Sequence, residues 1–224
     1  MGDWGEIPMS ALKRLWAQAP LLALLLLIDI FFIANHFLYK ERGVPSPYSI
    51  SADGNIVEIY GYLKWMACVL ALLYAFGRRR DLLYFAWALL FFYFLLDDAA
   101  LIHERLGKYI AGIFFSSEFV ANIRAKSLGE LVVSAAAGVF LLGFIAFAYF
   151  RRGADASARA FTRQMAPWLG MLVFCGVVVD TFGSRMRLPL RSSIIEDGGE
   201  MIAASFLTAL AVQLALELRP GRKP

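Results

Sequence analysis

Acidic and histidine side chains gather in this sequence where hydrophobic segments end. Directly after the apolar run 82–96 come Asp97, Asp98, His103 and Glu104. Ionisable groups at the edge of membrane hydrocarbon are costly, so they usually face one another inside a bundle and mark a functional site. Carboxylates beside a histidine nitrogen are ligands for divalent metal ions. The pattern therefore predicts a polar, metal-binding site at one membrane face.

The other hydrophobic segments add acids at the same predicted face, and we expect these groups to come from at least three helices and to point into one cavity. The expected metal ligands are Asp97, His103, Glu104, Glu130, Asp180, Glu196 and Glu200. Zn, Mn, Fe and Ca all accept such ligands, and the ligand types alone do not choose among them. A second group is expected to pair or to relay protons, and it consists of Asp29, His36, Glu58, Lys64 and Asp98. Asp29 lies deepest in its segment, where a carboxylate is either protonated or paired, for instance with Lys64.

The composition is that of a polytopic membrane protein. Of the 224 residues, 60% are hydrophobic, and the mean hydropathy is +0.62. The apolar runs lack period-two alternation and are long enough to cross about 30 Å of hydrocarbon as helices. We therefore expect an all-α transmembrane helical bundle, with residues 1–224 forming one domain. Its six spans are predicted at about 16–39, 57–76, 82–102, 128–150, 166–183 and 195–218.

Basic residues set the expected orientation. Clusters follow the second, fourth and sixth spans, at 78–80, 151–152 and 219–223. Because positive residues favour the cytoplasmic side, both termini are expected there, in a bacterial inner (plasma) membrane. The formal charge of +4 then needs no nucleic acid partner, and the lipid bilayer is the expected partner. Residues from about 109 to 124 have an interrupted apolar face, which predicts a short helix on the outer membrane surface.

Simpler interpretations of the polar residues stay open. The acids could pair with basic side chains and only anchor helix ends, and the candidate partners are Arg105, Lys108, Arg185, Arg187 and Lys64. A haem held by His36 and His103 is disfavoured, because histidines near helix ends more often bond backbone or carboxylate groups.

Two short motifs resemble those of uncharacterised bacterial multi-pass inner-membrane proteins. They are Asp97-Asp98 with His103-Glu104, and later Glu196-Asp197 with Glu200. The resemblance implies a membrane bundle and carries no activity. Alkaline ceramidase-like membrane hydrolases also hold a metal within a helical bundle, through three zinc-binding histidines. This chain has two histidines in total, so a three-histidine zinc site within one chain is excluded.

Three functions fit these patterns. The first is a metal-binding protein that hydrolyses a lipid or other amphiphile, in which the metal polarises a carbonyl and a carboxylate acts as base. The second is an accessory or structural subunit of a larger membrane complex, in which the acids only pair. The third is a proton- or cation-coupled transporter whose relay would be Asp29, Asp97, Asp98 and Asp180. Against the third, no span is interrupted by the glycine and proline pairs typical of many transporters. No nucleophile motif selects a reaction.

Overall fold

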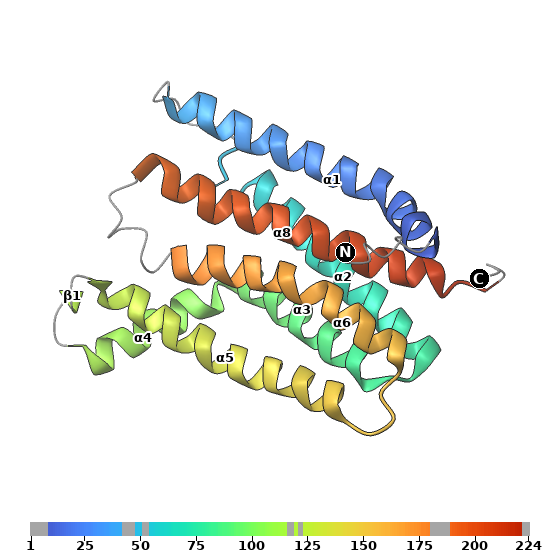
Figure 1. Ribbon diagram of the computed structural model, residues 1–224. Coiled ribbons are helices and arrows are strands. Elements are labelled where there is room, and N and C mark those ends of the chain that lie inside the picture. The colour runs from blue at the N-terminus through green and yellow to red at the C-terminus, as the bar shows by residue number, and fades with distance from the viewer. Residues whose placement is uncertain are drawn as a thin grey trace, which may run out of the picture.

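The computed structural model describes residues 9–41, 48–50, 54–115, 119–120, 123–179 and 189–220, and it is a bundle of long helices (Figure 1). The elements are α1 (Met9–Glu41), α2 (Ile56–Arg79), α3 (Leu82–Ala100), α4 (Ile102–Phe114), β1 (Phe119–Val120), β2 (Ile123–Arg124), α5 (Ala125–Phe150), α6 (Ala156–Val173), the π-helix η1 (Phe174–Val179) and α8 (Pro189–Glu217). Six segments are long and apolar enough to cross a membrane, namely Ala19–Tyr39, Ile56–Arg79, Leu82–Ala100, Ala125–Phe150, Ala156–Val179 and Ile194–Glu217. The predicted six-span helical fold is confirmed.

Aspartate caps build the two turns that carry arginines. Asp81 caps α3 by accepting the N–H of Leu83 at 2.8 Å, and Asp155 caps α6 in the same way. The other carboxylate oxygen of Asp81 accepts the N–H of Asp155 at 2.6 Å, which joins the two turns. The basic clusters 78–80 and 151–152 therefore lie at one end of the bundle, where α8 also ends (Figure 1). The arginine clusters must lie at one end of the bundle if they all face the cytoplasm. That this end faces the cytoplasm stays a prediction.

The core lies between α2, α3, α6 and α8. Trp65, Phe91 and Trp87 stack in series, with ring centroids 5.8 Å apart in each pair. Trp87 donates its indole N–H to Thr162 at 3.0 Å, so its polar atom is satisfied within the core. Aromatic pairs of this kind add about 0.5–1.5 kcal/mol beyond the area that they bury. This packing fixes how α2 and α3 are rotated about their axes, and hence which of their polar residues face the interior.

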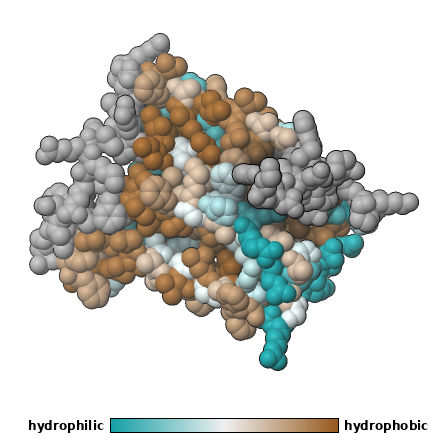
Figure 2. Space-filling model, viewed as in Figure 1, coloured by the Kyte–Doolittle hydropathy of each residue, from teal (hydrophilic) through white to brown (hydrophobic). Residues whose placement is uncertain are grey.

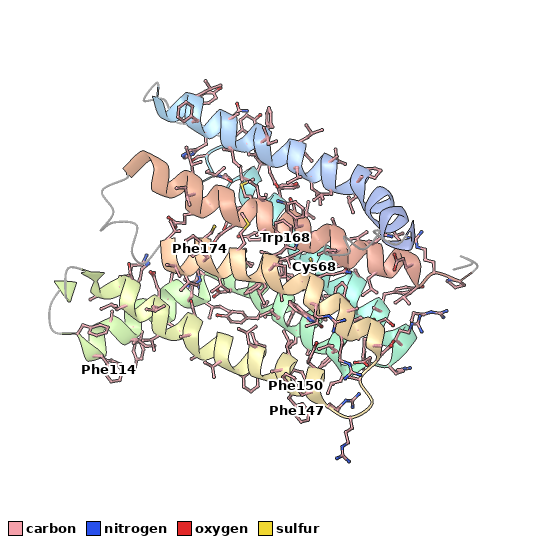
Figure 3. All side chains as sticks on the ribbon, viewed as in Figure 1. Cys68, Phe114, Phe147, Phe150, Trp168 and Phe174 are labelled. Atoms are coloured by element: carbon pink, nitrogen blue, oxygen red, sulfur yellow. The ribbon has the colours of Figure 1, made fainter. Side chains whose placement is uncertain are left out.

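The outer surface of the bundle is apolar, as contact with lipid requires. Along α5, Val139, Phe140, Phe147 and Phe150 are 63% to 81% exposed, and Figure 3 shows Phe147 and Phe150 directed away from the other helices. Figure 2 shows apolar surface over much of one face, with hydrophilic side chains gathered toward the end that holds the arginine-rich turns. An exposed apolar surface this large marks membrane contact.

The helix near the predicted interfacial segment is shifted along the chain, and its place on the membrane surface stays a prediction. It was expected at about 109–124, whereas the helix is α4, and residues 119–120 pair with 123–124 as the short strands β1 and β2. α3 stops short of the predicted residue 102 because Leu101 takes a left-handed conformation with φ of 50°, which separates α3 from α4. A single left-handed residue carries no hydropathy signal, so the sequence pattern could not place this break.

The fifth span starts earlier than its predicted residue 166. α6 begins at Ala156 and runs through Pro167, and η1 continues it to Val179. Its first turns carry arginines on one side and bury Ala158 and Phe161 on the other. Such an amphipathic beginning is helical and packed, yet its mean hydropathy is too low to be recognised as part of a span.

Candidate functional site

An acid-lined cavity of about 380 Å³ lies at the end of the bundle opposite the arginine-rich turns. Its walls come from the start of α2, the end of α3, the start of α4 and the first half of α8. Six carboxylates line it, those of Glu58, Asp98, Glu104, Glu196, Asp197 and Glu200. Tyr60, Lys64 and Trp65 of α2 also line it. Acids that are up to 142 residues apart in the sequence thus meet in one cavity.

The cavity contains part of the predicted metal-ligand set. Glu104, Glu196 and Glu200 line it, together with Glu58, Lys64 and Asp98 from the predicted pairing group. Among the described residues Asp97, His103 and Glu130 are not part of its lining, and Asp180 lies outside the described residues. No group of three or more His, Cys, Asp or Glu side chains within the described ranges is arranged to hold a metal ion. Metal binding therefore stays a prediction.

Aromatic donors orient two of the wall carboxylates. Trp65 donates its indole N–H to Asp98 at 2.7 Å. The Tyr62 hydroxyl donates to Glu58, which also accepts the N–H of Gly54. Hydrogen bonds to a carboxylate favour its ionised form, whereas burial disfavours it. These donors hold the two carboxylates in fixed positions on the wall formed by α2 and α3.

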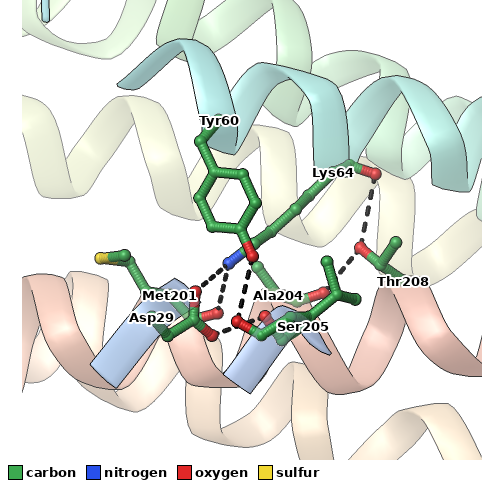
Figure 4. A network of polar contacts seen from close by, with 8 residues as sticks. Asp29, Tyr60, Lys64, Met201, Ala204, Ser205 and Thr208 are labelled. Atoms are coloured by element: carbon green, nitrogen blue, oxygen red, sulfur yellow. Dashed lines mark hydrogen bonds and ion pairs between the residues drawn. The ribbon is translucent and has the colours of Figure 1, made fainter. Parts of the chain in front are cut away.

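A buried ion pair joins Asp29 to the lining residue Lys64, and Figure 4 shows the network of polar contacts around it. Lys64 donates to Asp29 at 2.6 Å and to the carbonyl oxygen of Met201 at 3.0 Å, and its ammonium lies 4.2 Å from the centre of the Tyr60 ring. The second oxygen of Asp29 accepts the hydroxyl of Ser205 at 2.6 Å. The network joins α1, α2 and α8, and it contains the Asp29 and Lys64 partnership that the sequence suggested.

Asp29 and its partner Ser205 lie near the middle of their candidate spans. Asp29 is the central residue of the span Ala19–Tyr39, and Ser205 is next to the centre of Ile194–Glu217. Both are 0% exposed. An ionisable pair at this depth is expensive unless every polar atom is satisfied, and it is a functional-site candidate by default.

Asp97 and His103 form a separate pair at the junction of α3 and α4. One Asp97 oxygen accepts the backbone N–H of His103 at 2.8 Å, and the other lies 2.9 Å from its ring Nδ1. The hydrogen bond with Asp97 raises the pKa of His103 above its ordinary value of 6.5, although partial burial opposes this. The pair holds the start of α4 against the end of α3. The Nδ1 of His36, on α1, lies 3.2 Å from the hydroxyl of Ser49.

Glu104 and Glu130 meet lysines between α4 and α5. Lys126 lies 3.0 Å from Glu104 and 3.1 Å from Glu130, and Lys108 lies 3.4 Å from Glu104. The hydrogen bond with Lys126 lowers the pKa of Glu104. Exposed pairs like these contribute about 0–1 kcal/mol each. For Glu104 the structure therefore contains the pairing with Lys108 that the simpler interpretation suggested, beside a place in the cavity wall.

Glycines allow two close approaches around the site. A Cβ atom on Gly129 of α5 would overlap the carbonyl oxygen of Gly107 in α4, and one on Gly176 of η1 would overlap the Glu200 carboxylate. The second contact places a π-helical turn directly against a cavity acid. Short π-helical segments are often found at functional sites, and this one shapes the wall that holds Glu200.

Several site residues were absent from the sequence prediction. Tyr60 and Trp65 looked like ordinary aromatic packing residues, and Ser205 lies in an apolar segment. Asp197 was noted only as part of a motif. A signal for Ser205 did exist, since it precedes Thr208 by three residues on one face of a span that is otherwise apolar. Nothing in the sequence shows which partner that face meets.

One protein family matches residues 9–214, and its description is Domain of unknown function (DUF8692). The chain belongs to this family. The match covers all six candidate spans except the last three residues of α8, so the cavity and the ion pair lie within the family's domain. The chain matches no curated protein and no solved structure.

Proposed function

We propose that this membrane protein binds a divalent cation in the acid-lined cavity. The observation that supports the proposal is the convergence of carboxylates from four helices on one cavity at the end of the bundle. Carboxylates this concentrated repel one another unless a cation, a proton or a basic side chain separates them. Among the described lysines near the wall, Lys64 is held by Asp29, and Lys108 and Lys126 pair with Glu104. A cation from solution is the ligand that we propose for the wall.

The ligand types favour a hard cation. The described acids of the lining offer oxygens, and His103, whose Nδ1 lies 2.9 Å from Asp97, is not among the described lining residues. Carboxylate and water oxygens suit Mg, Ca and Mn better than Zn. A cavity of about 380 Å³ also has room for water molecules around the ion. A bound ion of this kind would polarise the carbonyl of an amphiphile, which is how the hydrolase activity considered from the sequence would arise.

Calorimetric titration with Mn²⁺ and Ca²⁺ after a chelator wash tests the proposal. We expect saturable binding that weakens on acidification, because protons compete for the carboxylates. Asp98→Asn and Glu200→Gln should each lower affinity on the order of tenfold or more. Glu217→Gln is the matched control, since Glu217 lies at the other end of α8 and contacts Gln213. Its affinity should equal that of the wild type.

The chain's own arginines are the competing ligands for the acids. Arg185, Arg187 and Arg191 immediately precede the cavity acids of α8 in the sequence. If they neutralise the wall, the wild type will show no saturable binding, and binding will appear only when these arginines are replaced by glutamine. That result, or equal affinities in Glu200→Gln and Glu217→Gln, would refute the proposal.

Cation-coupled transport is the second candidate, and the mid-span position of the ion pair favours it. A transported ion needs a polar route to both membrane faces. Beyond Thr208 toward the arginine-rich turns, the described core includes the apolar Leu72 and Ala211, each 0% exposed. Its buried polar residues Thr162 and Gln213 contact Trp87 and Glu217 within the protein. Binding from one end is therefore the better-supported function. Uptake of Mn²⁺ into proteoliposomes, with empty liposomes as control, distinguishes transport from binding.

A further inference from the structure

Lys64 belongs both to the buried ion pair and to the lining of the cavity. Its ammonium is held by Asp29 inside the bundle, and the same side chain lines the cavity. Asp29 is 0% exposed and is not among the described lining residues. The positive end of the pair therefore meets the cavity, and its negative end lies behind it. A cation bound in the cavity would therefore be closer to the positive charge of Lys64 than to the negative charge of Asp29.

The contacts of the pair explain why the lysine does not occupy the cavity itself. Asp29, the carbonyl oxygen of Met201 and the ring of Tyr60 surround the ammonium. Ser205 in turn fixes the carboxylate that holds it. Charge-assisted hydrogen bonds of 2.6 Å are among the stronger polar contacts in proteins. Asp29 thus holds the Lys64 ammonium at the cavity wall.

We infer that Lys64 is a tethered cation that competes with a cation in the cavity, and that Asp29 limits this competition. The inference rests on the proposed function. While Asp29 is ionised, it retains the ammonium and offsets part of its positive field. Without that carboxylate, the ammonium would extend toward wall acids such as Asp98 and Glu200, which the bound cation also needs. The Asp29–Lys64 pair then tunes the affinity of the cavity for the cation without coordinating the cation.

Thermodynamic linkage makes this effect reciprocal. If Lys64 weakens cation binding, a bound cation must repel Lys64 by the same free energy and press it toward Asp29. Asp29 is on α1 and Lys64 is on α2. Cation binding should therefore tighten the attachment of α1 to the bundle, although α1 contributes no described acid to the cavity wall.

Mn²⁺ titration of four proteins tests the inference: the wild type, Lys64→Met, Asp29→Asn and the double variant. Removing the unit charge of Lys64 from the wall of a cavity that holds a divalent ion, partly offset by the carboxylate behind it, should change affinity by about tenfold. Affinity should rise in Lys64→Met, fall in Asp29→Asn and be at least that of the wild type in the double variant. Thr208→Val is the uncharged control, because Thr208 contacts the backbone oxygen of Lys64 at 3.4 Å. Its affinity should be unchanged.

The two single variants separate competition from a purely structural role. A pair that only holds helices together would lower the affinity in both, and this result would overturn the inference. If Lys64→Met does not fold, the double variant decides, since an affinity below that of the wild type would also overturn it. Failure of every protein, including the wild type, to bind Mn²⁺ would refute the proposed function instead.

Discussion

The Asp29→Asn substitution tests how strongly the buried pair stabilises the fold. Asparagine keeps the shape of the side chain but removes the charge that faces Lys64 at 2.6 Å. The residues are 0% and 3% exposed, so the pair is shielded from bulk water. Removing one member of a buried pair costs about 3–5 kcal/mol when the other charge stays without compensation, and an ammonium that reaches the cavity acids regains part of this cost. For a chain of this length, that loss lowers the unfolding midpoint by about 6–20 °C.

The assay is thermal unfolding in detergent of Asp29→Asn, Lys64→Met and the double variant, as a double-mutant cycle. The double variant should lose less than the sum of the two single losses, because it leaves no unpaired charge. Asn35→Ala is the control on the same helix, since the Asn35 amide donates only to the Phe31 carbonyl of its own helix at 2.8 Å. It should change stability by about 0.5 kcal/mol or less. Additive losses, or an Asp29→Asn loss no larger than that of Asn35→Ala, would refute the reasoning.

Three further predictions concern orientation, packing and pH. With cytoplasmic termini, an accessibility label should reach Ser49→Cys from outside the cell and Ser157→Cys only from inside; the reverse pattern would place the cavity at the cytoplasmic face. Gly129→Ala would press a methyl group onto a backbone carbonyl of α4, so it should lower the unfolding midpoint, whereas Gly138→Ala, which meets nothing within 4 Å, should not. Because its folded pKa is raised, His103 stabilises the fold fully below about pH 6.5 and loses this contribution as pH rises through the folded pKa. The stability difference between wild type and His103→Gln should therefore be larger near pH 6 than near pH 9, and a difference that grows with pH would contradict the assignment.

Hydropathy and charge placement were enough to predict the bundle. Each candidate span overlaps a predicted one because lipid contact demands long apolar helices whatever their tertiary partners. The pairing of Asp29 with Lys64 was also within reach, because a carboxylate in the middle of a span has few ways to be satisfied. Both predictions use constraints that the bilayer imposes on a single helix.

Which residues line the cavity depends on how the helices are rotated about their axes and on where they are interrupted. Hydropathy and charge placement do not predict either feature. Asp97 and Asp98 are adjacent, yet the helical rotation of about 100° between them sends one to His103 and the other to Trp65 in the cavity wall. The left-handed Leu101 then redirects α4 and carries His103 away from the expected ligand set. Packing of the aromatic core decides the rotation, and that packing involves α6 and α8 as well as α3.

The bilayer explains why α1 depends on charge for its attachment. Lipid tails are as apolar as leucine, so burying an apolar helix face against the bundle yields no hydrophobic gain within the membrane. α1 has little of its apolar stretch buried, 22% compared with 44% for α8, although α5 has less still at 17%. Its hold on the bundle then rests strongly on Asp29, whose bonds to Lys64 and Ser205 have no substitute in lipid. Any charge that enters the cavity acts on Lys64 first, and α1 is the helix at the other end of that ion pair.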